Sequence, residues 1–486
     1  MPKTAGTLTC AREHSSSSAT TSLQFATFPP NYARPLHPPP LENSGTLRPL
    51  LRLAMPVLAE NLLAMLVGFS DQLLTGWYLG QDHLAAVNSM IYVLWFLISL
   101  FTFVSIAATA MVARFVGARD FDLANRVTGQ AFLIGLLLAV ATVAIGLTLG
   151  PGVVGLLQLS GPAAGLGVRY LWFILPVLPL MMCETVGNAC LRGAGDAVTG
   201  LVAMIVTNVV NVAVSWSLVV GWGGIPSQGW DGIAIGTASG YVVGGLVVLL
   251  RLLRGRAGLR LTWEAVRPDM DLLRRLLRIG IPGGTDVLSI VLCQLWFVRI
   301  VNELGTLPAA AHGVAIRIES LAYLPGAAFQ VAAAALCGQY LGAGDLRRAG
   351  RSVLTACLVG GGLMTAAGVL FFAAAEPLTR LFLRPEQADV QQIAVPLLRI
   401  VALAMPFLAL TMIFNGALRG AGDTRWPLLF SLVGYLGVRS PLAYLLAHGW
   451  GYGVQGAWWA MVIDLIVRCL MVSFRFLHGG WKRVKV

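Results

Sequence analysis

Two carboxylates, Glu60 and Asp71, lie inside the first long apolar stretch of the chain. A charged side chain at the centre of a membrane-spanning helix costs at least about 2.5 kcal/mol, so such groups face protein or water. A helix turns by about 100° per residue, so a spacing of eleven residues puts both acids on one face, about 16 Å apart along the axis. Two acids at different depths on one face suit a path for a proton or another cation. Pairing with a nearby arginine explains Glu60 equally well.

Small polar side chains form a stripe on the fifth apolar stretch. Asn208, Asn211 and Ser215 stand at positions i, i+3 and i+7, which share one face of a helix. Such a stripe suits a cavity for substrate or cation, and it suits hydrogen bonds between neighbouring helices equally well. Asp286, on the seventh stretch, occupies a similar face, and we count it among the residues expected to line the cavity.

Charged residues also lie within the apolar stretches near the C-terminus. Asp464 and Arg468 are separated by about one helical turn and can pair directly, and Arg439 can join them. This pattern favours a structural charge network over a role in substrate binding or gating.

The composition places these residues in a membrane. Hydrophobic residues make up 57% of the 486 positions and charged residues only 12%, against about 25% charged in soluble domains. The mean hydropathy is +0.76. These values exclude a soluble globular protein and a disordered chain. They predict an all-α polytopic membrane protein with twelve transmembrane helices, at roughly 52–77, 86–112, 127–150, 168–190, 198–221, 232–252, 279–303, 310–337, 352–374, 392–416, 427–447 and 453–475.

The net charge of +12 does not point to nucleic acid, because the arginines lie mainly in loops between apolar runs. With both termini on one side, the loops of that side hold 26 Lys and Arg and the opposite loops hold 3. Both termini are therefore expected in the cytoplasm. The expected parts are a disordered tail (1–46), an N-terminal lobe (47–252), a cytoplasmic linker (253–278) with a surface amphipathic helix over Met270–Arg278, a C-terminal lobe (279–476) and a basic tail (477–486).

The chain repeats itself at an offset of about 226 residues. Pro56 corresponds to Pro282 and Glu60 to Asp286, and the segment Leu191–Asp196 returns unchanged as Leu418–Asp423. Each half holds six spans, so the two repeats have the same orientation, as in transporters that hold substrate between or within their halves. The repeated segment, which contains Arg-Gly-Ala-Gly-Asp, predicts a tight cytoplasmic hairpin whose arginine meets the phospholipid surface.

These stretches together resemble the multidrug and toxic compound extrusion (MATE) transporters over about 50–475. The resemblance implies two six-helix lobes and cation-driven export of mostly cationic, amphipathic compounds. It rests on the order and duplication of several weak motifs. These are Met55-Pro56, Gly68–Asp71, Leu79-Gly80 through Ala85-Ala86, Ala113–Ala118, Leu191–Asp196, Ala310–His312, Gly338–Ala343 and Leu418–Asp423.

The resemblance also implies site residues. Asp71 closes the Gly68–Asp71 motif and corresponds to the acid on span one that is implicated in proton coupling. In the DinF-like branch, which this chain resembles more, an Asn and an Asp on span five join that acid. Asn211 matches the Asn, whereas Ser215 stands in place of the Asp. Thr237 matches a threonine of the N-lobe site and lies beside Gly232, Gly236, Gly240 and Gly244, which predict close helix packing.

The other branch uses two acids in the C-terminal lobe, and Ile290 and Leu408 stand at those positions, so its sodium site is expected to be missing. The resemblance thus implies a monomeric plasma-membrane antiporter that exports organic cations by alternating access, in exchange for protons, or for sodium held at Asp71 and Asn211. A flippase of the same superfamily for lipid-linked oligosaccharides is the alternative, because arginines of the C-terminal half suit a pyrophosphate. The short outer loops do not favour an enzyme, and we expect no cofactor and no nucleic-acid partner.

Overall fold

The computed structural model describes residues 45–156, 161–224 and 226–484. Within these ranges the chain is helical and contains no strand, which confirms the expected all-α fold. The N-terminal half consists of α1 (Leu47–Tyr78), α2 (Gln81–Ser99), α3 (Thr102–Gly117), α4 (Phe121–Leu156), α5 (Pro162–Ile174), α6 (Leu178–Gly193), α7 (Val198–Val220) and α8 (Trp230–Leu253). The short helix α9 (Trp263–Val266) follows. The C-terminal half consists of α10 (Met270–Glu303), α11 (Thr306–Gly342), α12 (Leu346–Ala373), α13 (Ala375–Arg380), α14 (Ala388–Gly420), α15 (Arg425–Leu432), α16 (Ser440–Tyr444) and α17 (Gly453–His478).

Three of the expected spans are interrupted helices. The second span changes from α2 to α3 at Leu100 and Phe101. The fourth contains a short 3₁₀ turn, Leu175–Val177, between α5 and α6, where the prolines of this segment remove backbone donors. The eleventh joins α15 and α16 through a π-helical turn at Val433–Arg439 and ends in a second π-helical turn at Leu445–Gly449.

Eleven helical segments of the described residues are long and apolar enough to cross a membrane. The twelfth expected span is α17, a helix of 26 residues whose apolar sequence is interrupted by Asp464 and Arg468. The helix count that the sequence predicts therefore agrees with the structure.

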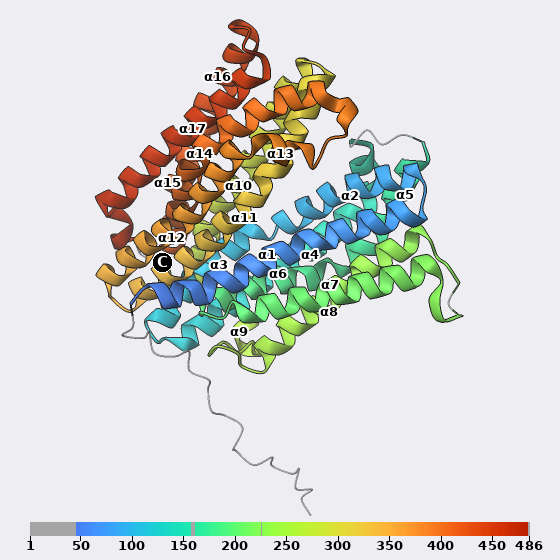
Figure 1. Cartoon of the computed structure of the whole chain (residues 1–486). Coiled ribbons are helices and arrows are strands. Elements are labelled where there is room, and N and C mark those ends of the chain that lie inside the picture. Colours follow the sequence, from blue (N-terminus) through green and yellow to red (C-terminus); the bar gives the residue numbers. More distant parts are fainter. Residues whose placement is uncertain (1–44, 157–160, 225, 485–486) are drawn as a thin grey trace, which may run out of the picture. The chain divides into compact units, whose positions relative to one another are not determined.

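Two helical bundles follow each other along the chain. The helices coloured blue to green form one and those coloured yellow to red form the other (Figure 1). Each bundle has its own cluster of buried apolar side chains. A third cluster joins the first turns of α1 to α11, α12 and α14, so the beginning of the N-terminal half is packed against the C-terminal half.

Glycines bring the two bundles into backbone contact. A Cβ on Gly342 of α11 would overlap the carbonyl oxygen of Arg114, and one on Gly117 of α3 would overlap that of Gln339. Gln339 Nε2 also donates to the Gly193 carbonyl oxygen at 2.8 Å. These contacts lie beside the two Arg-Gly-Ala-Gly-Asp segments, 192–196 and 419–423, and we call this part of the molecule the hairpin end.

The segment between the halves packs against the N-terminal half. Gln130 Nε2 of α4 donates to the carbonyl oxygens of Ala265 and Arg267 at 2.9 and 2.6 Å. Asp269 caps α10 by accepting from the backbone N–H of Asp271 at 3.0 Å. Met270–Arg278 is not a separate surface helix, because it forms the first turns of α10 and continues into the seventh span.

Candidate functional site

Asp71 lies at a junction of three helices and is only 2% exposed. Asn211 Nδ2 of α7 donates to Asp71 Oδ1 at 3.1 Å. Thr237 Oγ1 of α8 donates to Asp71 Oδ2 at 2.6 Å. Ser70 Oγ donates to Asn211 Oδ1 at 3.0 Å, which fixes the amide with its NH₂ group toward the acid. Each carboxylate oxygen of Asp71 thus accepts from a neutral donor on another helix.

The glycine series of α8 explains how Thr237 reaches this position. A Cβ on Gly236 would overlap Ser215 Oγ, and one on Gly240 would lie 2.7 Å from the Thr207 carbonyl oxygen. Any side chain there would push α8 away from α7. The close packing that the sequence predicts is therefore present, and it holds Thr237 against Asn211, where Asn211 Nδ2 lies 3.2 Å from Thr237 Oγ1.

The other two residues of the polar stripe on α7 do not bind Asp71. Asn208 Nδ2 donates to the Met204 carbonyl oxygen of its own helix at 2.9 Å. Ser215 is fully buried against α8, and its hydroxyl has no hydrogen-bond partner among the described residues. Of the three, only Asn211 contacts the acid of α1.

Glu60 belongs to a separate cluster nearer the hairpin end. Arg192, at the end of α6, forms an ion pair with Glu60 Oε1, and Asn188 Nδ2 lies 3.4 Å from the same oxygen. Glu60 is buried, so this pair is shielded from solvent. Of the two explanations that the sequence offered, pairing with an arginine is the one that the structure contains.

The same pair occurs in the second repeat. Asp286 of α10 is completely buried and forms an ion pair with Arg419 at the end of α14. The expectation that the hairpin arginines meet lipid phosphates is therefore wrong for both, since each is bound to a buried acid at the start of its half. Asp286, expected beside the cavity, instead pairs with an arginine as Glu60 does.

The aspartates that close the two hairpin segments bind a second arginine each. Asp196 Oδ2 accepts from Arg256 Nε at 2.6 Å, and Asp423 Oδ2 accepts from Arg475 Nη2 at 2.8 Å. Arg256 follows the sixth span and Arg475 ends the twelfth. Each hairpin thereby ties together the first and the sixth span of its half.

The two hairpin aspartates differ in electrostatics. Burial raises the pKa of Asp196, but the hydrogen bonds from Arg256 and Thr199 outweigh burial and hold that pKa below its ordinary value. For Asp423 burial outweighs the bonds from Arg475, so its pKa is raised. The N-terminal hairpin therefore keeps its charge pair to lower pH.

The expected network of the C-terminal half is present. Arg468 Nε and Nη2 donate to the two oxygens of Asp464 at 2.8 and 2.9 Å, and Arg439 Nε lies 2.9 Å from Asp464 Oδ2. Arg468 Nη1 also donates to Tyr435 Oη at 2.7 Å. All three charged side chains are buried. Arg439 lies at the end of the π-helical turn, which brings its side chain to α17.

Sequence reasoning missed Glu184 of α6. This residue is 5% exposed, and neither carboxylate oxygen has a hydrogen-bond partner among the described residues. The sequence does contain a pattern that identifies Glu184 as a candidate. It is an acid inside the expected fourth span, and it lies two helical turns before Arg192 on the same face.

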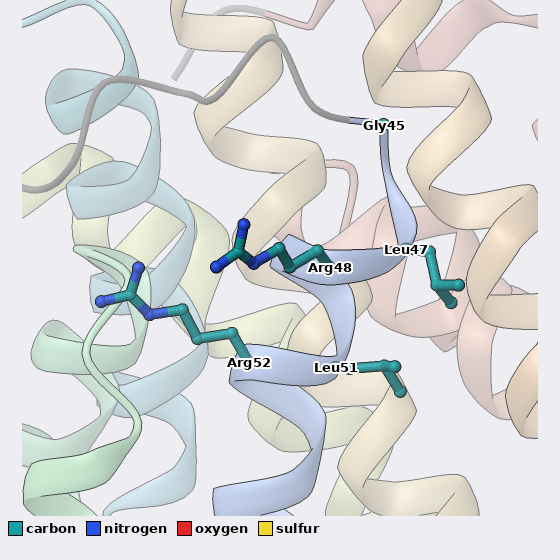
Figure 2. A pocket seen from close by; sticks show the side chains of 5 residues that line it. All are labelled: Gly45, Leu47, Arg48, Leu51 and Arg52. Carbon is teal, nitrogen blue, oxygen red and sulfur yellow. The ribbon is translucent and has the colours of Figure 1, made fainter.

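An open hollow of about 830 Å³ lies beside the first turns of α1 (Figure 2). Arg48 and Arg52 extend to one side of the helix there, and Leu47 and Leu51 extend to the other. This hollow is at the beginning of α1, many turns before Asp71, and we assign it no part in the site. Among the described residues, no group of three or more His, Cys, Asp and Glu side chains could hold a metal ion.

A model of the MatE family matches residues 56–217 and 282–445, which together are more than half of the chain. The chain belongs to the MATE family. It is 27% identical to a probable multidrug resistance protein NorM of Thermotoga maritima, over 89% of the chain and 93% of that protein. It is 29% identical to the multidrug resistance protein NorM of Burkholderia vietnamiensis, over 87% of the chain and 92% of that protein.

Solved structures share the fold. An outward-facing conformation of a multidrug resistance MATE family transporter matches with a TM-score of 0.81 at 22% identity, over 91% of the chain and 98% of that structure. A transporter of the MOP superfamily from Pyrococcus furiosus matches with a TM-score of 0.83 at 21% identity, over 90% and 97%. This MATE chain is thus a multi-pass membrane transporter and not an enzyme.

Proposed function

We propose that this MATE protein exports organic, cationic and amphipathic compounds in exchange for protons, and that Asp71 carries the coupling proton. The observation behind the proposal is that Asp71 is buried and that, among the described residues, its carboxylate oxygens accept only from the neutral Asn211 and Thr237. A buried carboxylate whose hydrogen-bonding partners are neutral can gain or lose its charge without leaving a permanent counter-charge unpaired. The names of the relatives, multidrug resistance proteins, support the choice of substrate class.

The charge of Asp71 would bias the transport cycle. In the ionised form it attracts a cationic substrate into the N-terminal half, and in the protonated form that attraction is gone. A proton taken up on the outer side therefore favours substrate release, and loss of that proton inside prepares the site for the next molecule. An ion can drive such a change only through its different affinity for the two conformations.

The ligands around Asp71 favour a proton over sodium. Asn211 turns its NH₂ group to the carboxylate, and its amide oxygen accepts from Ser70. Oxygen ligands are what hard cations require, and within the part of the chain that the structure describes, the side-chain contacts of Asp71 supply only its own two oxygens and that of Thr237. A proton needs no further ligands.

The flippase alternative rests on the charge of the C-terminal half. Arg439 and Arg468 share the single carboxylate Asp464, so this cluster carries excess positive charge. That charge suits a pyrophosphate. However, Arg468 already donates to both oxygens of Asp464 and to Tyr435, so it has few donors left for a ligand, and we prefer cation export.

We also propose that the protein is a monomer, that it lies in the plasma membrane, and that both of its termini are in the cytoplasm. The support is the excess of Lys and Arg in the loops on that side. The hairpin end would then face the cytoplasm.

Purified protein in liposomes tests the proposed function. Uptake of the fluorescent cation ethidium is measured with an imposed pH gradient in sodium-free buffer, and separately with a sodium gradient at equal pH. Protein-free liposomes are the control. We expect concentrative uptake with the pH gradient alone. Uptake with the sodium gradient alone would overturn proton coupling. Absence of uptake in both, together with movement of a pyrophosphate-linked lipid between leaflets, would favour the flippase.

A further inference from the structure

The carboxyl group of Glu184 on α6 lies at a close contact between α6, α7 and α8. A Cβ on Gly244 of α8 would overlap Thr207 Oγ1 and would lie 2.9 Å from Glu184 Oε2. The hydroxyl oxygen of Thr207 and the carboxylate oxygen of Glu184 therefore both lie close to Gly244, where a larger residue would collide with them. Thr207 is completely buried, and like Glu184 its side-chain oxygen has no hydrogen-bond partner among the described residues. Buried polar atoms without a partner are rare in folded proteins and call for an explanation.

Glu184 lies between two clusters already described. On α6, the residues Glu184, Asn188 and Arg192 follow each other at intervals of four and form one stripe that ends at the Arg192–Glu60 pair. On α7, Thr207 stands one turn from Asn211, which donates to Asp71. Polar groups thus continue from Asp71 through Thr207 and Glu184 to the hairpin end.

The charged and titratable groups that face Glu184 leave it without a counter-charge. From its own helix Arg192 lies within electrostatic range, but that arginine is already paired with Glu60 of α1. From α8, Tyr241 lies within range of both Glu184 and Asp71. Glu60 adds a like charge. An ionised carboxylate in such surroundings is costly, whereas a protonated one carries no charge and avoids that cost.

We propose that Glu184, beside the hydroxyl of Thr207, is a second proton-binding site of this transporter and passes protons between Asp71 and the hairpin end. The ligand is a proton because a metal cation would require more oxygen ligands than Glu184 and Thr207 present. In the transfer, the O–H bond of one carboxyl breaks and one forms on the other, which leaves the first as a carboxylate. This role in transport depends on the proposed function, whereas proton binding by Glu184 can be tested without it.

The second repeat provides an internal comparison. Asn188 and Arg192 have counterparts in Asn415 and Arg419, but the position of Glu184 is taken by Thr411 and that of Asp71 by Phe297. Phe297 is buried in the apolar core of its half. The C-terminal half therefore keeps the hairpin ion pair and lacks counterparts of Glu184 and Asp71, so the ion pair does not require these two acids.

Infrared spectra of the purified protein, recorded over a pH series, test the site. A buried protonated carboxyl gives a C=O band distinct from the amide bands, and no transport substrate is needed. We expect Glu184→Gln to remove one such band, Thr207→Val to shift it, and Asp71→Asn to leave it in place. Glu386→Gln, which removes an exposed acid, is the matched control.

The outcomes separate the site from the proposed function. If the band survives in Glu184→Gln, Glu184 does not bind the proton and the proposal is wrong. If Glu184→Gln does not fold, an unshifted band in Thr207→Val is sufficient to overturn it. A band that is lost as expected, in a protein that takes up no ethidium under a pH gradient, would keep the proton site and reject proton-driven export.

Discussion

Asp71 and Thr237 connect the first and the sixth span of the N-terminal half, with 2.6 Å between Oδ2 and Oγ1. Asn211 of α7 completes the junction. Because the acid is on one helix and its donors are on two others, any movement of α1 against α7 and α8 changes the hydrogen bonds that stabilise the charge of Asp71. A change of conformation therefore changes the affinity of Asp71 for a proton, and protonation of Asp71 changes the relative stability of the conformations.

Removing the hydroxyl donor should change the pH dependence of transport. Thr237→Val keeps the shape of the side chain but leaves Asp71 Oδ2 without its donor. Hydrogen bonds to charged groups contribute about 1.5–3 kcal/mol, and one pH unit corresponds to about 1.4 kcal/mol. We expect the midpoint of pH-dependent ethidium binding to move upward by about one unit or more. Ser217→Ala, which removes an exposed hydroxyl of α7, should leave the midpoint unchanged; an unchanged midpoint in Thr237→Val would argue against Asp71 as the titrating group.

The two repeated ion pairs should be important for stability. Arg192→Gln leaves Glu60 buried without a counter-charge, and Arg419→Gln does the same to Asp286. Breaking a buried pair from one side costs on the order of 3 kcal/mol, so both variants should melt several degrees below the unmodified protein. Adding Glu60→Gln to Arg192→Gln should restore much of the loss, because no charge then remains buried. No recovery in the double variant would show that Arg192 acts through other contacts.

The hairpin aspartates should differ in their effect on stability. Asp196 has a lowered pKa, so its pair contributes fully above the ordinary aspartate pKa of about 4 and is lost as pH falls through the lowered value. Asp423 has a raised pKa, so its ionised form gains little from folding. At pH 7, Asp196→Asn should destabilise by about 1–2 kcal/mol, a figure reduced because the Arg256 side chain is 35% exposed. Asp423→Asn should destabilise the protein less than Asp196→Asn does. Thermal melts of both variants at pH 7 and pH 5 measure this difference, and a larger loss of stability in Asp423→Asn would contradict it.

The glycine contact between α7 and α8 should not tolerate a methyl group. Gly240→Ala would place a carbon 2.7 Å from the Thr207 carbonyl oxygen, which is backbone and cannot move aside easily. The helices must separate, and Thr237 moves away from Asp71. Overpacking of this kind costs about 1–3 kcal/mol. Gly362→Ala meets no atom within 4 Å and is the matched control. Equal melting temperatures of the two variants would contradict the close contact.

Much of the fold and the centre of the site could be predicted from the sequence. Apolar length and the repeat predict the helices and the two halves, and the resemblance selects Asp71, Asn211 and Thr237, which do meet. The role of Asn208 could not be decided from the sequence, because its side chain can bind either a neighbouring helix or the carbonyl oxygen four residues earlier on its own helix. In the structure it donates to that carbonyl oxygen, of Met204.

The partners of the arginines could not be predicted, because they depend on packing between segments far apart in the chain. Arg192 and Arg419 end apolar helices, which is equally compatible with lipid phosphates and with a buried acid. Only the packing of α1 on α6 and of α10 on α14 brings Glu60 and Asp286 within reach. The eleventh span contains Gly434, Gly437 and Pro441, but these residues are also compatible with a regular or kinked α-helix, so the π-helical turn that determines where Arg439 points could not be predicted.

The central claim is that protonation of Asp71 couples export to the pH gradient. The most direct measurement is proton movement on addition of ethidium to liposomes that contain either the unmodified protein or Asp71→Asn, with Asp389→Asn, an exposed acid, as the matched control. We predict that the unmodified protein and Asp389→Asn move protons against dye, whereas Asp71→Asn remains folded and binds dye but moves no protons and does not concentrate the dye under a pH gradient. Dye-coupled proton movement by Asp71→Asn at the rate of the unmodified protein would contradict the account.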